Sequence, residues 1–551
     1  MNRAWLPAAC LLLASACGGG APGDAPAEAG GVPEAERFGG SAVVAVNADI
    51  EDLNPLTLSA TQAGQIAREL LFVTLLRHDE RLELVPGLAR TWEVGPDTSF
   101  LVFRLRDDVF WHDGRKTTAS DVKFSYDRAR DPRTAAANTA LWSAYGEMEV
   151  VDSLTVRVAM QPHAEFLAAW AYFAPVPRHL LEGVPPEELR RHPFSTQLPV
   201  GNGPFRVQRR TPGQGWTLAA NPRFPGEMGG RPYLDHLFVR VIPEATTAVT
   251  ELLTGRVDYL VGLPPAERAR VEADEGTRAA AFQTPGYTHI IWNGRRPFFR
   301  DARVRRALTI AIDRQAIIDG LLFGGADLGA TTVSPMLWNY DAHAGAPLRH
   351  DPGTAARLLE AAGWRDRDGD GIREDSAGRP FRFTLSGNKA NLTGEDVMEK
   401  VQADLRRVGV AADLRLEEFN SLLARIQDPG SREFDAVLNS RSTGFRIDDR
   451  DSFHCGRMNG RYQTAGFCDP RMDRLLDTLP RILDRRAALP LWKEYQRLLV
   501  EQQPYAFLYH PHALVGVSRR LQNVRPDARG ALAGARGWWV LPGERATPGE
   551  R

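Results

Sequence analysis

A strand–helix–strand pattern in the second half of the chain most constrains its fold. Residues 381–385 form an apolar run typical of a strand, and residues 395–408 follow as a helix that Gly409 can end. Residues 410–416 then alternate as a second strand, and residues 434–438 are another short apolar run. A strand, a helix and a strand in succession predict parallel pairing through a right-handed crossover. The chain is therefore expected to have an α/β fold.

Chain length and charge narrow the class further. The chain has 551 residues, more than one hydrophobic core usually serves, so two or more lobes are expected. It carries 68 basic and 69 acidic residues, for a net charge of -1. A chain with balanced charge has no excess of positive charge to attract nucleic acid or anionic lipid, so neither is an expected binding partner.

The N-terminus has the pattern of an export signal. Arg3 precedes an apolar stretch, residues 5–16, that is shorter than the roughly 20 residues needed to span a bilayer. Small residues then precede Cys17, which resembles the lipobox of bacterial lipoproteins, although Ala14 stands where that motif usually has Leu. We expect residues 1–17 to be a lipoprotein signal and Cys17 to be lipidated. Ordinary signal cleavage near Ala16, with a soluble product, is the alternative.

Residues 18–40 are rich in Gly, Ala and Pro and poor in large apolar residues, so a flexible tether is expected. Other local signals predict helices further along the chain. Thr118 with Asp121 has the spacing of a capping box, and Asp301 precedes apolar residues at helical spacing.

Two of the four cysteines lie in the signal, which leaves Cys455 and Cys468. An even pair in an exported protein predicts a disulfide. The alternative is a nucleophile–base pair of Cys455 with His454. We disfavour it because neighbouring residues on an extended chain point to opposite faces.

A series of motif-like segments runs along the chain in a fixed order: 84–92, 103–114, 118–125, 199–205, 231–235, 242–248 and 301–314. Taken in this order, they resemble the family 5 extracellular solute-binding proteins, the peptide- and nickel-binding group. Asn202 replaces the Thr usual in one of the motifs. The resemblance covers essentially residues 41–540.

The resemblance implies a two-lobed periplasmic-binding-protein clamp of the large, class II or cluster C type, with mixed sheets and two hinge strands. Lobe I, with an extra subdomain, would comprise residues 41–285 and 510–545, and lobe II residues 286–509. The hinge strands would lie near 287–292 and 504–510. The implied function is to capture di- or oligopeptides between the lobes and deliver them to ABC permease subunits. The protein would be a monomer on the periplasmic or cell-surface side of the membrane, held there by its lipid.

The resemblance also points to a ligand-binding loop at residues 444–453. In peptide-binding members an aromatic residue is followed by an Asp that receives the ligand's amino terminus, which matches Phe445 and Asp448. Asp449 and Asp451 compete for this role, and a solvated loop is the alternative. Cys455 and Cys468 lie where dipeptide-binding members carry a disulfide, and such a bond would hold this loop in place.

Further ligand contacts are expected from position in the chain. Tyr287, His289 and Trp292 lie on a predicted crossing and should line the cleft. Trp338 lies in a turn-rich segment that could wall a pocket, and Asn388 precedes a helix whose N-terminus could meet a ligand anion. The alternatives are core packing for the aromatic residues and a surface loop for Asn388.

No metal, cofactor or catalytic site is expected. Residues 366–371 imitate the start of a calcium loop, but Ala377 occupies the position of the bidentate Glu, so a hairpin-like turn is predicted. The sequence contains no H-E-x-x-H, G-x-S-x-G or Walker motif. The alternatives are a receptor for a nickel chelate, an opine or a sugar, a secreted lipoprotein enzyme, and a sensor.

Overall fold

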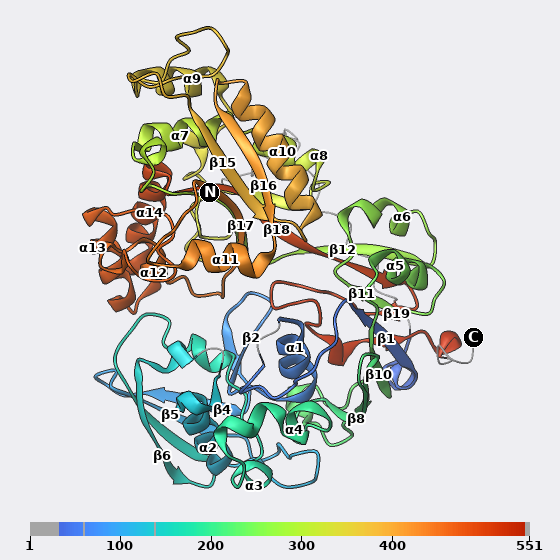
Figure 1. Ribbon diagram of the computed structural model, residues 1–551. Coiled ribbons are helices and arrows are strands. Elements are labelled where there is room, and N and C mark those ends of the chain that lie inside the picture. The colour runs from blue at the N-terminus through green and yellow to red at the C-terminus, as the bar shows by residue number, and fades with distance from the viewer. Residues whose placement is uncertain (1–31, 59–60, 137–138, 546–551) are drawn as a thin grey trace, which may run out of the picture.

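The computed structural model describes residues 32–58, 61–136 and 139–545. The predicted signal, including Cys17, and most of the predicted tether lie outside these residues. Figure 1 shows two bodies: a lower one coloured blue to green, with red C-terminal segments, and an upper one coloured green to orange-red. β12 and β18 lie between them.

One mixed sheet of twelve strands passes through both bodies. Its main path runs β16-β15-β17-β13-β18-β11-β1-β10-β9-β8, and β12 and β14 also pair with β18. The bounds are β1 (Ser41–Val46), β8 (Phe205–Thr211), β9 (Gly215–Ala220), β10 (His236–Val241), β11 (Tyr259–Val261), β12 (Thr277–Gln283), β13 (Gly286–Trp292), β14 (Ala326–Leu328), β15 (Arg382–Asn388), β16 (Ala411–Glu417), β17 (Ala436–Ser442) and β18 (Tyr505–Ser518).

The strand–helix–strand unit is confirmed. β15 pairs in parallel with β16, and α10 (Leu392–Arg406) connects them. The helix begins earlier than predicted because Asn391 caps it, accepting a hydrogen bond from the Gly394 amide at 3.0 Å. β17 also runs parallel to β15, whereas β13 and β18 run antiparallel to their neighbours.

A second, antiparallel sheet, β4-β5-β7-β6, belongs to the lower body. α2 (Ala119–Arg130) packs on it, and the predicted capping box is present, since the Thr118 amide donates to Asp121 Oδ2 at 2.9 Å. The strands are β4 (Ala89–Val94), β5 (Phe100–Leu105), β6 (Tyr145–Asp152) and β7 (Thr155–Met160). The remaining strands form two antiparallel sheets of two strands each: β2 (Leu76–His78) with β3 (Leu84–Pro86), and β19 (Leu521–Gln522) with β20 (Trp539–Val540).

The other helices cover the sheets. Asp301 caps α7 as predicted, accepting from the Arg303 amide at 2.8 Å. Within the part of the chain that is described, no helix combines the length and the apolar character needed to cross a membrane. The bounds are α1 (Thr61–Ile66), continued by a π-helical turn (Ala67–Leu71), α3 (Arg178–Leu181), α4 (Pro193–Thr196), α5 (Ala245–Leu253), α6 (Arg268–Glu272), α7 (Ala302–Ala311), α8 (Arg314–Gly320), α9 (Pro352–Ala361), α11 (Phe419–Gln427), α12 (Arg450–Phe453), α13 (Pro470–Thr478) and α14 (Arg485–Gln502).

The buried apolar side chains fall into separate clusters. Those of the lower body come from residues 42–282 and 515–540, and those of the upper body from residues 287–509. Each body therefore has its own hydrophobic core. The division into lobe I (41–285 with 510–545) and lobe II (286–509) stays our proposal for the boundaries.

Two chain crossings join the lobes. Thr284 and Pro285 separate β12 from β13. β18 pairs with β13 through its first half and with β12 through its second half. His510 Nδ1 lies 2.8 Å from the Gly286 carbonyl oxygen, so the two crossings touch at the hinge.

Candidate functional site

A cleft of about 1750 Å³ lies between the lobes and takes its walls from both. The π-helical turn, β2 and the segment after β18 contribute the lobe I wall, and the loop after β17 contributes much of the lobe II wall. Apolar and charged side chains are mixed in the lining. Its acidic residues are Glu69, Glu80, Glu227, Asp448, Asp451 and Asp477.

Asp448 and Phe445 both line the cleft. The Asp448 carboxylate forms two hydrogen bonds with the Arg450 guanidinium, at 2.9 Å from Nε and 2.6 Å from Nη2. Burial by itself raises the pKa of Asp448, but the hydrogen bonds and charge of Arg450 outweigh it and hold the pKa below its usual value. Asp448 is therefore a carboxylate that already has a partner before ligand arrives.

Phe445 reaches across the cleft to lobe I. Its ring meets His78 edge-on with 4.8 Å between centroids, and Tyr172 lies 6.4 Å away. Burial, with the nearby charge of Arg485 as a second cause, lowers the pKa of His78 to about 4, so this imidazole is neutral near neutral pH.

The three candidate carboxylates of this loop have different surroundings. Asp449 does not line the cleft; it is 3% exposed and accepts hydrogen bonds from Thr332 Oγ1 at 2.6 Å and the Tyr495 hydroxyl at 2.5 Å. Burial raises its pKa. Asp451 does line the cleft and lies 3.5 Å from Arg457. Asp449 does not face the cleft; it is buried and supports the loop from the side that faces away from the cleft.

Tyr287, His289 and Trp292 are placed differently from expectation. All three are 2% exposed or less and lie in the lobe II core, and none lines the cleft. The physical reason is that β13 is an interior strand between β17 and β18, with apolar clusters on both of its faces. The burial of His289 lowers its pKa to about 3.

Trp338 and Asn388 also lie away from the main cleft. Trp338 is half-buried beside it, in a small pocket of mixed lining, with the Arg485 guanidinium 5.2 Å from its ring centroid. Asn388 ends β15, and its side-chain oxygen accepts from the Ala390 amide at 3.0 Å. The expected anion position at the N-terminus of α10 is occupied by the cap Asn391 instead, so Asn388 is not placed to meet a ligand in the cleft.

The predicted disulfide is confirmed. Cys455 and Cys468 are joined, with an S–S distance of 2.08 Å. The bond ties the end of the 444–453 loop to the start of α13 and leaves no free thiol for His454 to activate.

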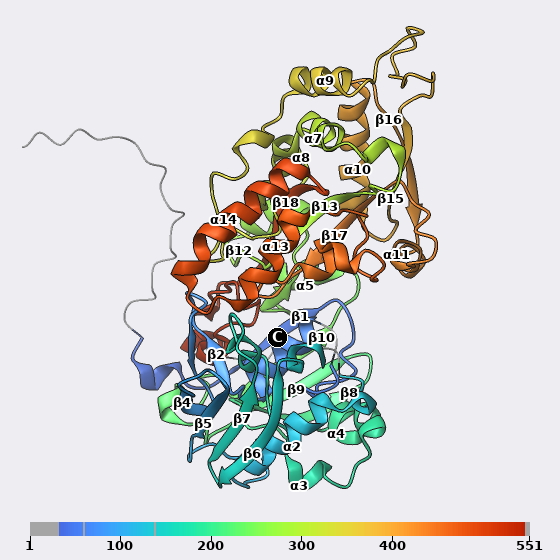
Figure 2. The same cartoon turned by 90° about the vertical axis from the view of Figure 1, so that its left-hand side faces the viewer.

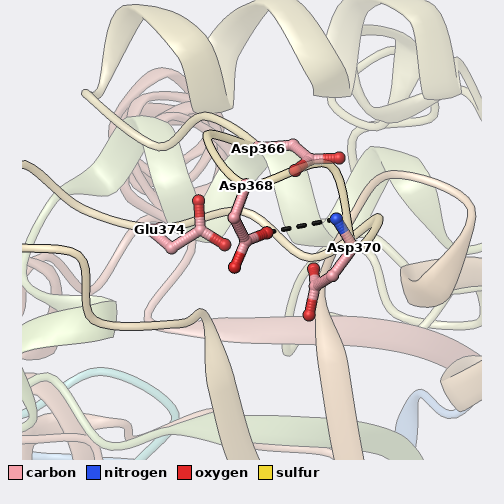
Figure 3. A group of neighbouring side chains, drawn as sticks. All are labelled: Asp366, Asp368, Asp370 and Glu374. Atoms are coloured by element: carbon pink, nitrogen blue, oxygen red, sulfur yellow. Dashed lines mark hydrogen bonds between the residues drawn. The ribbon is translucent and has the colours of Figure 1, made fainter.

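The loop at residues 366–374 forms the hairpin-like turn that was predicted, closed by a bridge between Arg365 and Glu374. Asp366, Asp368, Asp370 and Glu374 lie together in this loop (Figure 3), and one candidate ligand atom of each lies within 4.8 Å of the others. Backbone amides of the loop already donate to these carboxylates, for example Gly369 to Asp366 at 2.7 Å and Arg367 to Glu374 at 2.7 Å.

No sequence pattern predicts the arginines of the lobe I wall. Arg68, Arg77, Arg529 and Arg536 line the cleft from three segments that are far apart in the chain. No spacing or motif links these segments, so only the folded chain brings their side chains together.

Two lobes with separate cores, two hinge strands and a deep cleft between them define a protein of the binding class that closes around a solute. The sequence profile described as "Bacterial extracellular solute-binding proteins, family 5 Middle" matches residues 83–455, and the chain belongs to this family. The predicted two-lobed α/β fold and the family resemblance are thereby confirmed.

Individual relatives match over most of the chain. The oligopeptide-binding protein AppA of Bacillus subtilis is 27% identical over 533 residues, or 96% of each chain. Its structure in complex with a nonapeptide has a TM-score of 0.75, with 26% identity over 92% of this chain and 99% of that one. The dipeptide-binding protein of Escherichia coli is 26% identical over 81% of this chain and 85% of its own length. The nickel-binding periplasmic protein of the same organism is 26% identical over 69% and 72%.

Proposed function

We propose that this protein is the substrate-binding component of an ABC importer, which captures peptides between its lobes and delivers them to the permease. The observation that carries the proposal is the cleft of about 1750 Å³ lined by both apolar and charged side chains. A peptide brings amides, charged termini and apolar groups together, and each polar group needs a partner once water is excluded. The whole-length similarity to an oligopeptide-binding protein supports peptides over a nickel chelate, for which the matching relative covers less of the chain.

Phe445 and Asp448 are the proposed ligand contacts. Asp448 would receive the peptide's ammonium group in a charge-assisted hydrogen bond, shared with Arg450. Phe445 would pack on the ligand's apolar part from the lobe II side while it contacts His78 of lobe I. Phe445 would therefore couple ligand binding to closure of the lobes.

Native mass spectrometry of the protein as purified, followed by calorimetry with the recovered compounds, tests the proposal. We expect short peptides to be recovered and to bind without being cleaved. Asp448→Ala should weaken their binding by roughly 2–5 kcal/mol, as for truncating one partner of a buried charged pair. Asp413→Asn is the matched control, because Asp413 is exposed on β16 in a pair with Arg382. Recovery of a non-peptide solute, or turnover of the peptide, would refute the proposal.

The attachment to the membrane is a separate part of the proposal. Family members are extracellular solute-binding proteins, which supports export of this chain. We infer that Cys17 is lipidated and becomes the first residue of the mature protein, that residues 18–40 tether a monomeric binding body near the membrane, and that the body has no catalytic activity. Intact-mass measurement of the membrane fraction should show a diacylglyceryl adduct that Cys17→Ala abolishes. A soluble product cleaved near Ala16 would contradict the inference.

A further inference from the structure

The lobe I wall of the cleft concentrates positive charge. Arg68 lies in the π-helical turn, Arg77 on β2, and Arg529 and Arg536 in the segment after β18, and all four line the cleft. β18 places that C-terminal segment against the N-terminal half of the chain.

The contacts of these arginines leave much of their charge unpaired. Arg529 forms an ion pair with Asp527, with Nε 2.9 Å from Oδ1. Arg68 lies 5.3 Å from the ring centroid of Tyr172, Arg77 donates to the Pro86 carbonyl at 3.3 Å, and Arg536 donates to the Gly229 carbonyl. Among the described residues, no carboxylate oxygen lies within 4.0 Å of the side-chain nitrogens of Arg68, Arg77 or Arg536.

The acidic residues of this wall do not balance the four guanidinium groups. Glu69 lies among them but forms no ion pair within 4.0 Å with a described residue. Glu80 is exposed, and Glu227 is already engaged by Arg106 at 2.8 Å and Arg90 at 3.5 Å.

The lobe II wall does not supply the missing negative charge. Asp448 pairs with Arg450 at 2.6 Å, Asp451 lies 3.5 Å from Arg457, and Asp477 lies 3.4 Å from His454. The positive charge of the lobe I wall is therefore left for a ligand to neutralise.

Without an anion nearby, the excess positive charge of these arginines is energetically unfavourable inside the cleft. Burial lowers the pKa of Arg77; Glu69 opposes the shift, and the neighbouring Arg536 and Arg529 add to it. Closure of the lobes would exclude water and strengthen this repulsion. A guanidinium fork matches a carboxylate geometrically and binds it with two charge-assisted hydrogen bonds.

We propose that Arg68, Arg77, Arg529 and Arg536 form an anion subsite that takes the carboxylate of an Asp or Glu side chain of the captured peptide. The inference rests on the proposed function and adds a ligand class to it: peptides with an acidic residue are the preferred cargo. Asp448 on the opposite wall and this subsite would then hold groups of opposite charge.

Two nonapeptide libraries test the subsite, identical except that one carries Glu where the other carries Gln. We expect the intact protein to retain the Glu library about tenfold or more over the Gln library, the effect of one charge-assisted contact. We expect the preference to fall in the single variant Arg77→Gln and to fall further when Arg77→Gln is combined with Arg536→Gln. Both variants should weaken binding of the Gln library less than binding of the Glu library. Arg303→Gln is the control, because Arg303 is 56% exposed, pairs with Asp301 and lies outside the cleft.

The possible results distinguish failure of the subsite from failure of the proposed function. Equal retention of the two libraries, or a preference that survives both variants, overturns the subsite while leaving peptide capture intact. Binding of neither library overturns the proposed function and the subsite together. The libraries are also tested with amidated C-termini: a Glu preference that persists supports the side chain as the source of the carboxylate, whereas equal retention of the two libraries that amidation weakens assigns the subsite to the peptide terminus and overturns the inference. The Arg77 side chain is exposed to the cleft, so its replacement should not prevent folding. The single variant therefore still tests the subsite if the double variant does not fold.

Discussion

The lobes meet at a hinge and at a rim, and the two contacts differ in kind. At the hinge, β18 forms backbone hydrogen bonds with β13 along its first half, with a register shift between Thr288 and His289, and with β12 along its second half. At the rim, which we define as Arg485, Glu165, Glu83, Phe445 and His78, the contacts are made by side chains, beside one backbone hydrogen bond from the Ala164 amide to the Pro480 carbonyl at 2.6 Å. Arg485 reaches Glu165 at 2.9 and 3.0 Å and Glu83 at 3.2 Å. Figure 2 shows α14, which begins at Arg485, reaching toward the β2 hairpin.

The difference indicates which contact opens. Breaking the hinge would leave a row of backbone groups without partners inside the sheet, and a buried backbone group without a partner is energetically unfavourable. The rim consists of partly exposed ion pairs, which typically contribute about 0–1 kcal/mol each, of one aromatic contact, and of the one backbone hydrogen bond from Ala164 to Pro480. We therefore expect the lobes to separate at the rim while the hinge ladder stays intact.

The largest expected effect is at the anchor of the hinge strand. Arg520, just after β18, forms a buried ion pair with Asp258, at 2.5 Å from Nε and 2.6 Å from Nη2. Asp258→Ala leaves a buried, uncompensated guanidinium and should lower the free energy of unfolding by roughly 3–5 kcal/mol. Urea denaturation followed by tryptophan fluorescence measures the loss. Asp235→Ala, in the partly exposed pair with Arg231, is the control, and a similar loss in both variants would contradict the prediction.

Removal of the disulfide comes next. Cys455 and Cys468 are 13 residues apart, and closing a loop of this size stabilises a chain by roughly 3 kcal/mol through the entropy of the unfolded state. The double variant Cys455→Ser with Cys468→Ser should lose about that free energy of unfolding. Reductant should destabilise the native protein to the same extent and leave the double variant unchanged; sensitivity of the variant to reductant would count against the assignment.

A smaller effect is expected when the rim ion pair is removed. Arg485→Met deletes the contacts with Glu165 and Glu83 and the cation–π contact with Trp338, so closure should weaken by about 1 kcal/mol. Small-angle scattering should give a larger radius of gyration for the variant than for the native protein. High salt should reduce the difference because it screens the ion pairs. Arg133→Met, an exposed arginine outside the cleft, should not change the radius.

The pH dependence of the rim is expected to be smallest near neutral pH and to grow as the solution becomes acidic. The pKa of His78 is lowered to about 4, below the value near 6.5 of an exposed imidazole, so the unfolded chain binds this proton first. The contribution of His78 to stability is complete above about pH 6.5 and is lost as the pH falls toward 4. Denaturation midpoints of the native protein and His78→Gln should diverge between pH 7 and pH 5, with the native protein losing more. Parallel curves would show that this group does not titrate at the rim.

Short-range patterns were enough to predict several elements correctly. The β15–α10–β16 unit, the capping box at Thr118 and the Cys455–Cys468 pair depend on residues close together in the chain. In such segments hydrogen bonding and turn geometry are decided locally.

The candidate site could be predicted only in part. Phe445 and Asp448 were predicted from the resemblance to peptide-binding family members, and both line the cleft. Tyr287 and His289 were expected there and are buried, because an apolar run looks the same whether its strand borders a cleft or lies inside a sheet.

The sequence by itself determined the family, the α/β composition, the presence of two lobes and the loop that carries Asp448. Only the tertiary structure decided which side chains face the cleft. It buried Asp449 while leaving its neighbour Asp448 in the lining, and it brought Arg68, Arg77 and Arg529 together from distant segments. The physical reason is that secondary structure depends mainly on near neighbours in the chain, whereas a binding wall depends on long-range strand pairing that no local pattern encodes.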